Sequence, residues 1–370
     1  HHGFIRVELK KALYGLIESG NLWYHHITET LKDLGFKQAH ADQCIFRRGK
    51  QIIGVYVDDL LLLTDNQKEK EDLIKEIEVK YPGLKRSHGN RFTYRGLQIE
   101  QLPTKILINQ KDYISQLLKD EKIIKISKVP ASRNLFKKQE VGSFLNRSEQ
   151  SKFQETLAKV MWIANQTRPE IKMVTSILAS RVQNPDTDDQ AKLKKVLEYL
   201  NGTKDLGLVF TKASTNLRAY ADAAHLVHPD CRGHSGAVIL MGKNIIHCES
   251  KKQKLVSQSS TEAELVSLNS CLNGVLWLRN LMNELGFEQV KTKIYQDNMS
   301  CITMANNGRP TRGTKHMKMR YFHVKSKMTD GTVQVKYKDT KRMLADVLTK
   351  PIESSKIFAR FRDKLLGTET

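Results

Sequence analysis

Two adjacent aspartates, Asp58 and Asp59, interrupt an apolar run that extends from Ile52 to Leu63. The residues before them are β-branched and aromatic, which is typical of a strand, and the apolar stretch after them can pair back on it. Burying two ionised carboxylates there would be costly without a compensating cation. We therefore expect a hairpin with both aspartates at its tip, where carboxylate oxygens suit Mg²⁺ or Mn²⁺. A surface turn that happens to carry two acids is the alternative.

A second set of acidic residues lies in the last third of the chain, where the pattern predicts strand, strand, helix, strand and helix. Its members are Asp222 at the end of a strand over 217–222, Glu264 in a long helix over 257–285, Asp297 at the end of a strand over 293–297, and Asp346 in 343–348, which we expect to start a final helix. Converging carboxylates can hold two divalent cations about 3.5–4 Å apart, and such a pair activates water and stabilises a leaving oxygen.

Glu262 and Glu264 cannot both face such a site from one helix, because positions two apart point in nearly opposite directions. The run Ser259-Ser260-Thr261-Glu262 fits a capping box, in which Glu262 turns back to the helix start. Glu264 is then free to meet metal, so we assign Glu264 to the site and Glu262 to structure.

The chain of 370 residues has a net charge of +21 and a pI near 9.6. This excess favours a polyanionic partner such as nucleic acid. Five scattered cysteines without a Cys-x-x-Cys pair indicate free thiols in a reducing compartment. No apolar run approaches the ~20 residues of a membrane span, and we expect no membrane partner.

Several motifs resemble the Pol polyproteins of copia-type LTR retrotransposons. They are Leu9-Lys10-Lys11-Ala12-Leu13-Tyr14-Gly15-Leu16 followed by Trp23-Tyr24, the hairpin motif Tyr56-Val57-Asp58-Asp59, the runs 167–171 and 199–204, the segment from Ser259 to Glu264, and Ala345-Asp346-Val347-Leu348-Thr349-Lys350. The hairpin motif is similar to the palm signature of reverse transcriptases. The order of the second acidic set is similar to that of ribonucleases H.

The resemblance implies an α/β fold with the following parts. These are a partial reverse transcriptase palm over 1–100, thumb and connection helices over 101–215 with a polar linker at 128–148, a ribonuclease H domain with a mixed five-stranded sheet and flanking helices over 216–350, and a C-terminal tail over 351–370. Within the palm end, the pattern from Tyr94 to Ile99 predicts a strand.

The resemblance also implies the chemistry: DNA synthesis on RNA or DNA templates at the hairpin, and hydrolysis of RNA in RNA–DNA hybrids at the second acidic set. Each site would use two Mg²⁺ or Mn²⁺ ions. The expected catalytic and metal-binding residues are Asp58, Asp59, Asp222, Glu264, Asp297 and Asp346. The residues expected to contact nucleotide or nucleic acid are Lys10, Lys11, Tyr14, Gly15, Tyr56, Lys315, His316 and Arg320.

The implied partners are RNA–DNA hybrid, primer-template, deoxynucleoside triphosphates and the rest of a Pol polyprotein. The implied location is cytoplasmic, in virus-like particles, with the nucleus as an alternative. In this family a third polymerase carboxylate precedes the Leu-Tyr-Gly-Leu block, so we expect the polymerase site to be incomplete within these residues. Two alternatives stay open: activity of the ribonuclease H alone, or a non-catalytic nucleic-acid-binding remnant.

The assignment of the two glutamates can be tested directly. Replacing Glu264 with Gln should abolish cleavage of an RNA–DNA hybrid in Mg²⁺, because the site loses a carboxylate, whereas Glu262→Gln should retain it. Cleavage is measured by gel on a labelled RNA strand. The reverse result would contradict the assignment.

Overall fold

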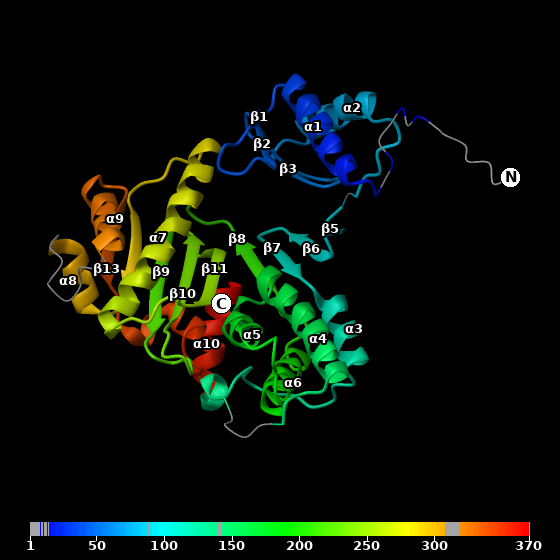
Figure 1. The fold of residues 1–370 in the computed structure, drawn as a ribbon. Helices are drawn as coiled ribbons and strands as arrows, with labels where there is room; N and C mark the ends of the chain where they lie inside the picture. Colours follow the sequence, from blue (N-terminus) through cyan, green and yellow to red (C-terminus); the bar gives the residue numbers. More distant parts are fainter. Residues whose placement is uncertain are drawn as a thin grey trace. The chain divides into compact units, whose positions relative to one another are not determined.

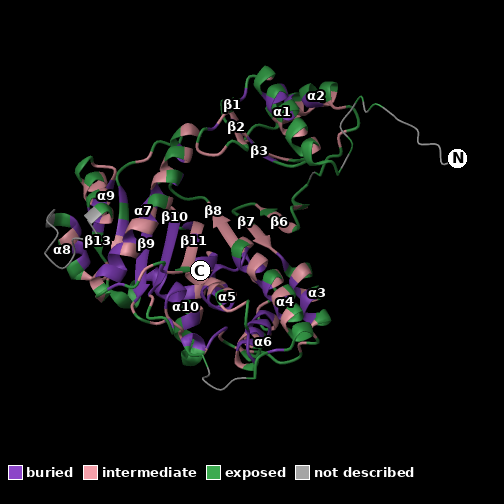
Figure 2. Ribbon diagram, in the orientation of Figure 1, coloured by how far each residue is buried: buried purple, intermediate pink, exposed green. Residues whose placement is uncertain are grey.

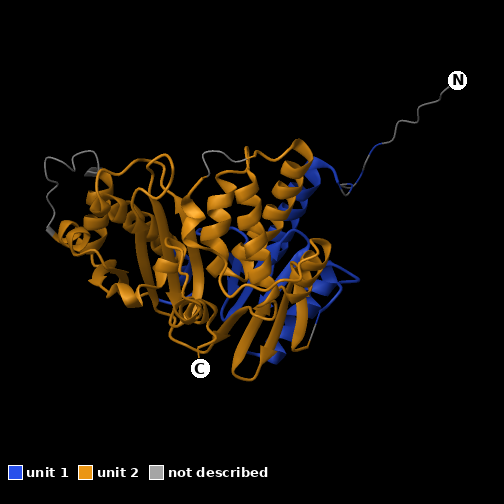
Figure 3. Ribbon diagram, turned by 90° about the horizontal axis from the view of Figure 1, so that it is seen from below, with its two compact units in different colours: residues 1–87, 280–288 blue, residues 88–279, 289–370 orange. Residues whose placement is uncertain are grey.

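The computed structural model describes residues 8, 10, 13, 15–87, 89–138, 143–307 and 318–369. The chain divides into two compact units, 1–87 with 280–288 and 88–279 with 289–370 (Figure 3). Four residues expected to contact nucleotide or nucleic acid lie outside the described ranges: Lys11, Tyr14, Lys315 and His316. The boundaries drawn at 100, 215 and 350 remain predictions.

The first unit consists of two helices and a small antiparallel sheet in the order β1-β2-β3-β4 (Figure 1). Its elements are α1 (Ile17–Asp33), β1 (Lys37–Gln38), β2 (Ile45–Arg48), β3 (Gln51–Tyr56), β4 (Asp59–Leu63) and α2 (Gln67–Lys80). Residues 280–288 of this unit include the end of the later helix α7.

One apolar core holds the first unit together. Ile27 and Leu31 of α1, four positions apart, share a face, and Leu73 and Ile77 of α2 repeat this spacing. Both pairs pack with strand residues such as Ile53, which is buried while its neighbours in β3 are half-buried. Side chains repeat their direction every 3.6 residues in a helix and every 2 residues in a strand, so the apolar positions of both kinds of element face the same core.

The second unit begins with another antiparallel sheet, ordered β5-β6-β7-β8, and a group of helices. These elements are β5 (Arg91–Tyr94), β6 (Leu97–Leu102), β7 (Lys105–Asn109), α3 (Lys111–Asp120), η1 (Arg133–Phe136), α4 (Arg147–Gln166), η2 (Pro169–Ile171), α5 (Lys172–Ala179), α6 (Thr187–Asn201) and β8 (Leu208–Thr211).

The single strand expected from Tyr94 to Ile99 is wrong. The chain turns at Arg95 and Gly96, whose φ values of +51° and +73° are left-handed, and so makes a two-residue hairpin turn between β5 and β6. Glycine adopts this conformation readily, which allows the tight reversal.

A mixed five-stranded sheet in the order β11-β10-β9-β12-β13 forms the rest of the second unit (Figure 1). The pairs β9–β10 and β10–β11 are antiparallel, while β9–β12 and β12–β13 are parallel. Its elements are β9 (Leu217–Ala224), β10 (His234–Met241), β11 (Asn244–Lys252), α7 (Ser260–Glu284), β12 (Thr292–Gln296), α8 (Met299–Asn307), α9 (Lys318–Thr329), β13 (Val333–Tyr337), η4 (Thr340–Arg342), η5 (Leu344–Leu348) and α10 (Ser355–Leu366). The expected five-stranded mixed sheet with flanking helices is confirmed.

Segments expected as linker and tail contribute to the core of the second unit (Figure 2). Leu135 and Phe136, in the stretch expected to be a linker, are buried. The stretch expected to be a tail contains α10, whose Phe358 and Phe361 join the same core as the helices α4 to α6. The spacing of Phe358, Phe361 and Leu365 at i, i+3 and i+7 is the sequence signal for this helix, and the expectation of a tail overlooked it.

Asp346 does not start a final α-helix as expected. It lies in the short 3₁₀ helix η5, which ends at Leu348, and α10 begins separately at Ser355. Pro351 accounts for the break, because the residue before a proline is driven out of the α conformation. In the described part of the chain, no helix is both long and apolar enough to cross a bilayer.

A buried ion pair between Arg168 and Glu170 lies in the helical core of the second unit. Arg168, with no exposed surface, donates from Nε to Glu170 Oε1 at 2.8 Å and from Nη1 to the carbonyl of Thr203 at 3.0 Å. The Tyr199 hydroxyl donates to the same Glu170 oxygen at 3.0 Å. Glu170 is 1% exposed, so its charge depends on these donors.

We predict that Arg168→Met lowers the free energy of unfolding by about 3–5 kcal/mol, because it leaves the Glu170 carboxylate buried without a cation. Tyr199→Phe, the control, removes one neutral donor and should cost only about 1 kcal/mol. Urea denaturation measures both. Equal losses in the two variants would contradict the ion-pair explanation.

Candidate active site

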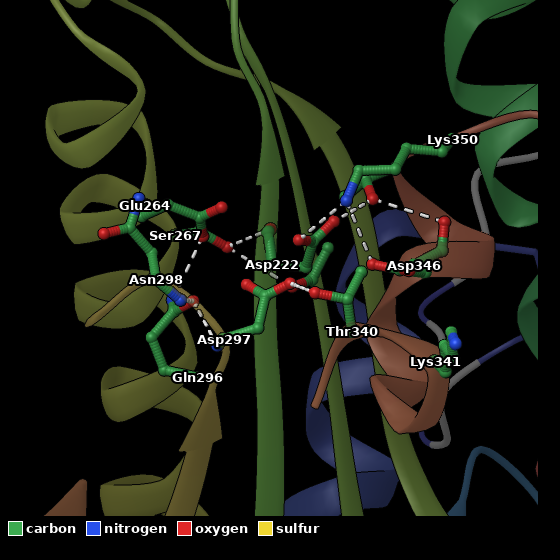
Figure 4. Close-up of polar contacts among 12 residues, drawn as sticks. Asp222, Glu264, Ser267, Gln296, Asp297, Asn298, Thr340, Lys341, Asp346 and Lys350 are labelled. Carbon is green, nitrogen blue, oxygen red and sulfur yellow. Dashed lines mark hydrogen bonds and ion pairs between the residues drawn. The ribbon is translucent and has the colours of Figure 1, made fainter. Parts of the chain in front are cut away.

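The register of two parallel strands places Asp222 and Asp297 side by side. Tyr220 of β9 is opposite Tyr295 of β12, and each aspartate follows its tyrosine by two positions. Side chains two apart in a strand point to the same face. Because parallel neighbours end at the same edge of a sheet, the two carboxylates meet there, as Figure 4 shows.

Asp346 reaches the same edge from η5. One carboxylate oxygen each from Asp222, Asp297 and Asp346 lies within 4.8 Å of the others. Gly236, opposite Asp222 on β10, allows η5 to come this close. A Cβ atom at position 236 would lie 3.0 Å from the carbonyl oxygen of Ala345, so a larger residue would push η5 away.

Glu264 approaches from α7 and is 6% exposed. Its Oε2 accepts a hydrogen bond from Gln296 Nε2 at 3.0 Å. Glu262 instead turns back, and its Oε2 accepts from the backbone N–H of Gln258 at 2.7 Å, while its own N–H donates to Ser259 Oγ at 3.2 Å. The two glutamates therefore point as the capping argument predicted; their roles remain predictions.

Several polar side chains around the carboxylates were missed by the sequence reasoning. Lys350 Nζ lies 3.2 Å from Asp222 Oδ1 and 3.1 Å from Asp346 Oδ1. The Thr349 hydroxyl donates to Asp222 Oδ2. The Thr340 hydroxyl donates to Asp297 Oδ2 at 2.7 Å, as Figure 4 shows. The spacing of four residues between Asp346 and Lys350 was the available signal.

Burial and mutual repulsion dominate the electrostatics of the site. Burial first, and then the Asp222 carboxylate, raise the pKa of Asp346 to about 7 against the opposing effect of Lys350. The same two causes raise the pKa of Glu264 well above its ordinary value. Burial lowers the pKa of Lys350, but Asp222 and Asp346 more than compensate, so that its pKa stays above its usual value.

This donor set fits a divalent cation. It offers only carboxylate oxygens, which hard ions such as Mg²⁺ and Mn²⁺ prefer, and three of these carboxylates bring an oxygen within 4.8 Å of one another. A second acidic group, Asp186 with Asp188 and Asp189, has a structural explanation. Asp186 and Asp189 form the capping box of α6, and Asp189 pairs with Arg181 at 2.7 Å.

The Asp58 and Asp59 hairpin forms as predicted. Tyr56 pairs with Asp59 across a two-residue turn at Val57 and Asp58, and all four residues are exposed. Val57 has a φ of +49°, an unfavourable value for a β-branched residue, and its carbonyl accepts from Trp23 Nε1 at 2.7 Å. Neither group of three acidic side chains found among the described residues includes these aspartates.

The remaining described residues expected to contact nucleotide or nucleic acid belong to different parts of the chain. Lys10 and Gly15 precede α1, and both are exposed. Arg320 lies in α9 and is half-buried. Among the described residues, the structure therefore gathers the second acidic set at one edge of the sheet.

Comparison with known proteins identifies the relatives. Residues 5–131 match the family described as reverse transcriptase (RNA-dependent DNA polymerase). The chain is 28% identical over 365 residues to a retrovirus-related Pol polyprotein from transposon RE1 of Arabidopsis thaliana, covering 97% of this chain and 25% of the relative. It is 27% identical to that of transposon TNT 1-94 of Nicotiana tabacum, covering 94% and 27%. These matches make the chain similar to copia-like retrotransposon Pol polyproteins.

The copia-like chain thus spans about a quarter of the length of these curated relatives. Among solved structures, a foamy viral protease-reverse transcriptase in complex with dsDNA aligns with 89% of this chain and 60% of its own, at 15% identity and a TM-score of 0.49. The expected family and the mixed α/β fold are confirmed, the fold by the strand order and directions given above.

The raised pKa of Asp346 predicts a pH-dependent loss of stability in EDTA. The unfolded chain releases this proton near pH 3.8, while the folded chain holds it to about pH 7. Between these values the folded state binds more protons, so the free energy of unfolding falls as pH rises.

Asp346→Asn removes this effect. Its free energy of unfolding relative to the wild type should rise by about 2–4 kcal/mol between pH 4 and pH 8, measured by urea denaturation. Taking the difference cancels titrating groups that do not interact with Asp346, including His228 and His234, whose pKa values burial lowers to about 4 and about 3. A difference that does not change with pH would contradict the prediction.

Proposed function

We propose that this chain is a retroelement reverse transcriptase and ribonuclease H fragment whose second unit hydrolyses RNA in RNA–DNA hybrids. The observation that carries this proposal is the convergence of Asp222, Glu264, Asp297 and Asp346 from four separate elements at one edge of a mixed sheet. The net charge of +21 supports a nucleic-acid partner.

The side chains of the site would have two roles, metal binding and orientation of the metal-binding groups. Asp222, Asp297 and Asp346 would hold divalent cations, with Glu264 opposite them. Bound Mg²⁺ or Mn²⁺ would supply an activated water and neutralise charge on the scissile phosphate. Thr340 and Gln296 orient Asp297 and Glu264 through their hydrogen bonds. A hybrid would be recognised by its shape and 2′-hydroxyl groups rather than by sequence.

A cleavage assay with the whole chain tests this proposal. In Mg²⁺ the chain should cut the RNA strand of a hybrid and leave a DNA duplex of the same sequence intact. Asp222→Asn should abolish cutting because it removes a carboxylate of the site. Asp186→Asn makes the same chemical change at a helix cap that asparagine can also form, so it should cut as the wild type does. An intact hybrid with the wild type would refute the proposal.

Template-directed DNA synthesis is the second candidate function, and it rests on the exposed hairpin within the reverse transcriptase match. Asp58 and Asp59 would hold divalent cations, with the primer end and a deoxynucleoside triphosphate as substrates. A primer-extension assay on RNA and DNA templates tests it, with Asp58→Asn as the inactive variant. Cleavage without extension would assign activity to the ribonuclease H alone, and binding with neither activity would indicate a non-catalytic remnant.

A further inference from the structure

The ammonium group of Lys350 lies between two of the candidate metal-binding carboxylates. Its Nζ is 3.2 Å from Asp222 Oδ1 and 3.1 Å from Asp346 Oδ1, and Figure 4 shows the side chain extending over both aspartates. Both ion pairs that the described chain makes to the four carboxylates come from this lysine.

The other contacts of the carboxylates are neutral. Hydroxyl groups of Thr349 and Thr340 donate to Asp222 and Asp297, and the amide of Gln296 donates to Glu264. These hydrogen bonds fix oxygen positions without adding positive charge. Lys350 therefore provides the positive charge that offsets repulsion among buried carboxylates, of which Asp222 is fully buried.

The ammonium group of Lys350 can also move away from the two aspartates into water. Its side chain is 43% exposed, in contrast to the fully buried side chain of Asp222. A lysine has a flexible four-carbon stem and a strongly hydrated ammonium group, so moving its head into water costs little. A divalent cation bound by Asp222 and Asp346 would use oxygens next to which the ammonium now lies, and two cations so close would repel each other.

We propose that Lys350 is a tethered counter-cation that holds Asp222 and Asp346 together before a divalent ion binds and then competes with that ion for them. The inference rests on the proposed two-cation site and adds its regulation. It makes Lys350 a positioning residue, which stabilises the empty carboxylate set and at the same time weakens divalent binding.

Direct Mn²⁺ titration tests the competition. Lys350→Met keeps the length and apolar character of the stem but removes the charge, so this variant should bind Mn²⁺ about tenfold more tightly than the wild type, since a unit charge about 4 Å away in a partly exposed site changes affinity by at least this factor. Free Mn²⁺ is counted by electron paramagnetic resonance, which does not depend on activity.

Two control variants separate this effect from general charge. Lys356→Met removes the same charge from an exposed position on α10 and should leave Mn²⁺ affinity unchanged. Lys350→Arg keeps a positive charge at the site and should bind Mn²⁺ with nearly wild-type affinity. A tighter Lys356→Met variant would show that only the net charge matters, which would overturn the proposal.

Thermal unfolding tests the other half of the inference. In EDTA at pH 8, Lys350→Met should unfold at a lower temperature than the wild type, because repulsion between Asp222 and Asp346 is no longer compensated. Adding Asp346→Asn to this variant should restore the lost stability, although Asp346→Asn removes a carboxylate. Saturating Mn²⁺ should raise the unfolding temperature of Lys350→Met more than that of the wild type.

The outcomes distinguish this inference from the function on which it rests. Mn²⁺ binding and hybrid cleavage by the wild type, with equal or weaker Mn²⁺ binding by Lys350→Met, would overturn the role of Lys350 and leave the function standing. No Mn²⁺ binding and no cleavage by the wild type would overturn both. Tighter binding together with lower stability in EDTA would support the inference.

Discussion

Repulsion among carboxylates at the end of β9 and β12 is the constraint on which the candidate site depends. Three of these groups bring an oxygen within 4.8 Å of one another, in a place where Asp222 has no exposed surface. Such a set is stable only if other groups compensate its charge or if some members take up protons. Both responses are present, since Lys350 bridges two aspartates and the pKa of Asp346 is raised to about 7.

The elements around the site hold these carboxylates close together. Parallel pairing of β9 and β12 aligns two aspartates, and Gly236 allows η5 to approach with the third. Ser267 of α7 donates to the carbonyl of Asp222 at 2.7 Å, which fixes the helix that carries Glu264 against the strand. Moving the carboxylates apart would disrupt strand pairing and buried packing, so we expect their charge to be met by a cation or by protons.

The sequence predicted most of what depends on local periodicity. Acids at strand ends and the opposite directions of Glu262 and Glu264 follow from periods of 2 and 3.6 residues, which operate over a few positions. It did not predict the hairpin at Arg95 and Gly96, the packed helix α10 or the place of Lys350. The hairpin is local and depends on the left-handed φ values of Arg95 and Gly96. The other two features depend on tertiary contacts: α10 buries Phe358 and Phe361 in a core shared with distant helices, and Lys350 meets Asp222 across 128 positions of sequence.

The two acidic sites therefore differ in whether the surrounding fold must compensate their negative charge. Asp58 and Asp59 lie exposed on a turn, where water screens their charges and where the Val57 carbonyl accepts a hydrogen bond from Trp23. No buried cation is needed there, so the hairpin can keep its shape whether or not it meets a metal or a nucleic acid. The second set has no such freedom. Its buried carboxylates need Lys350, bound protons or a divalent cation to offset their repulsion, so the stability of the second unit should depend on pH and on divalent cations.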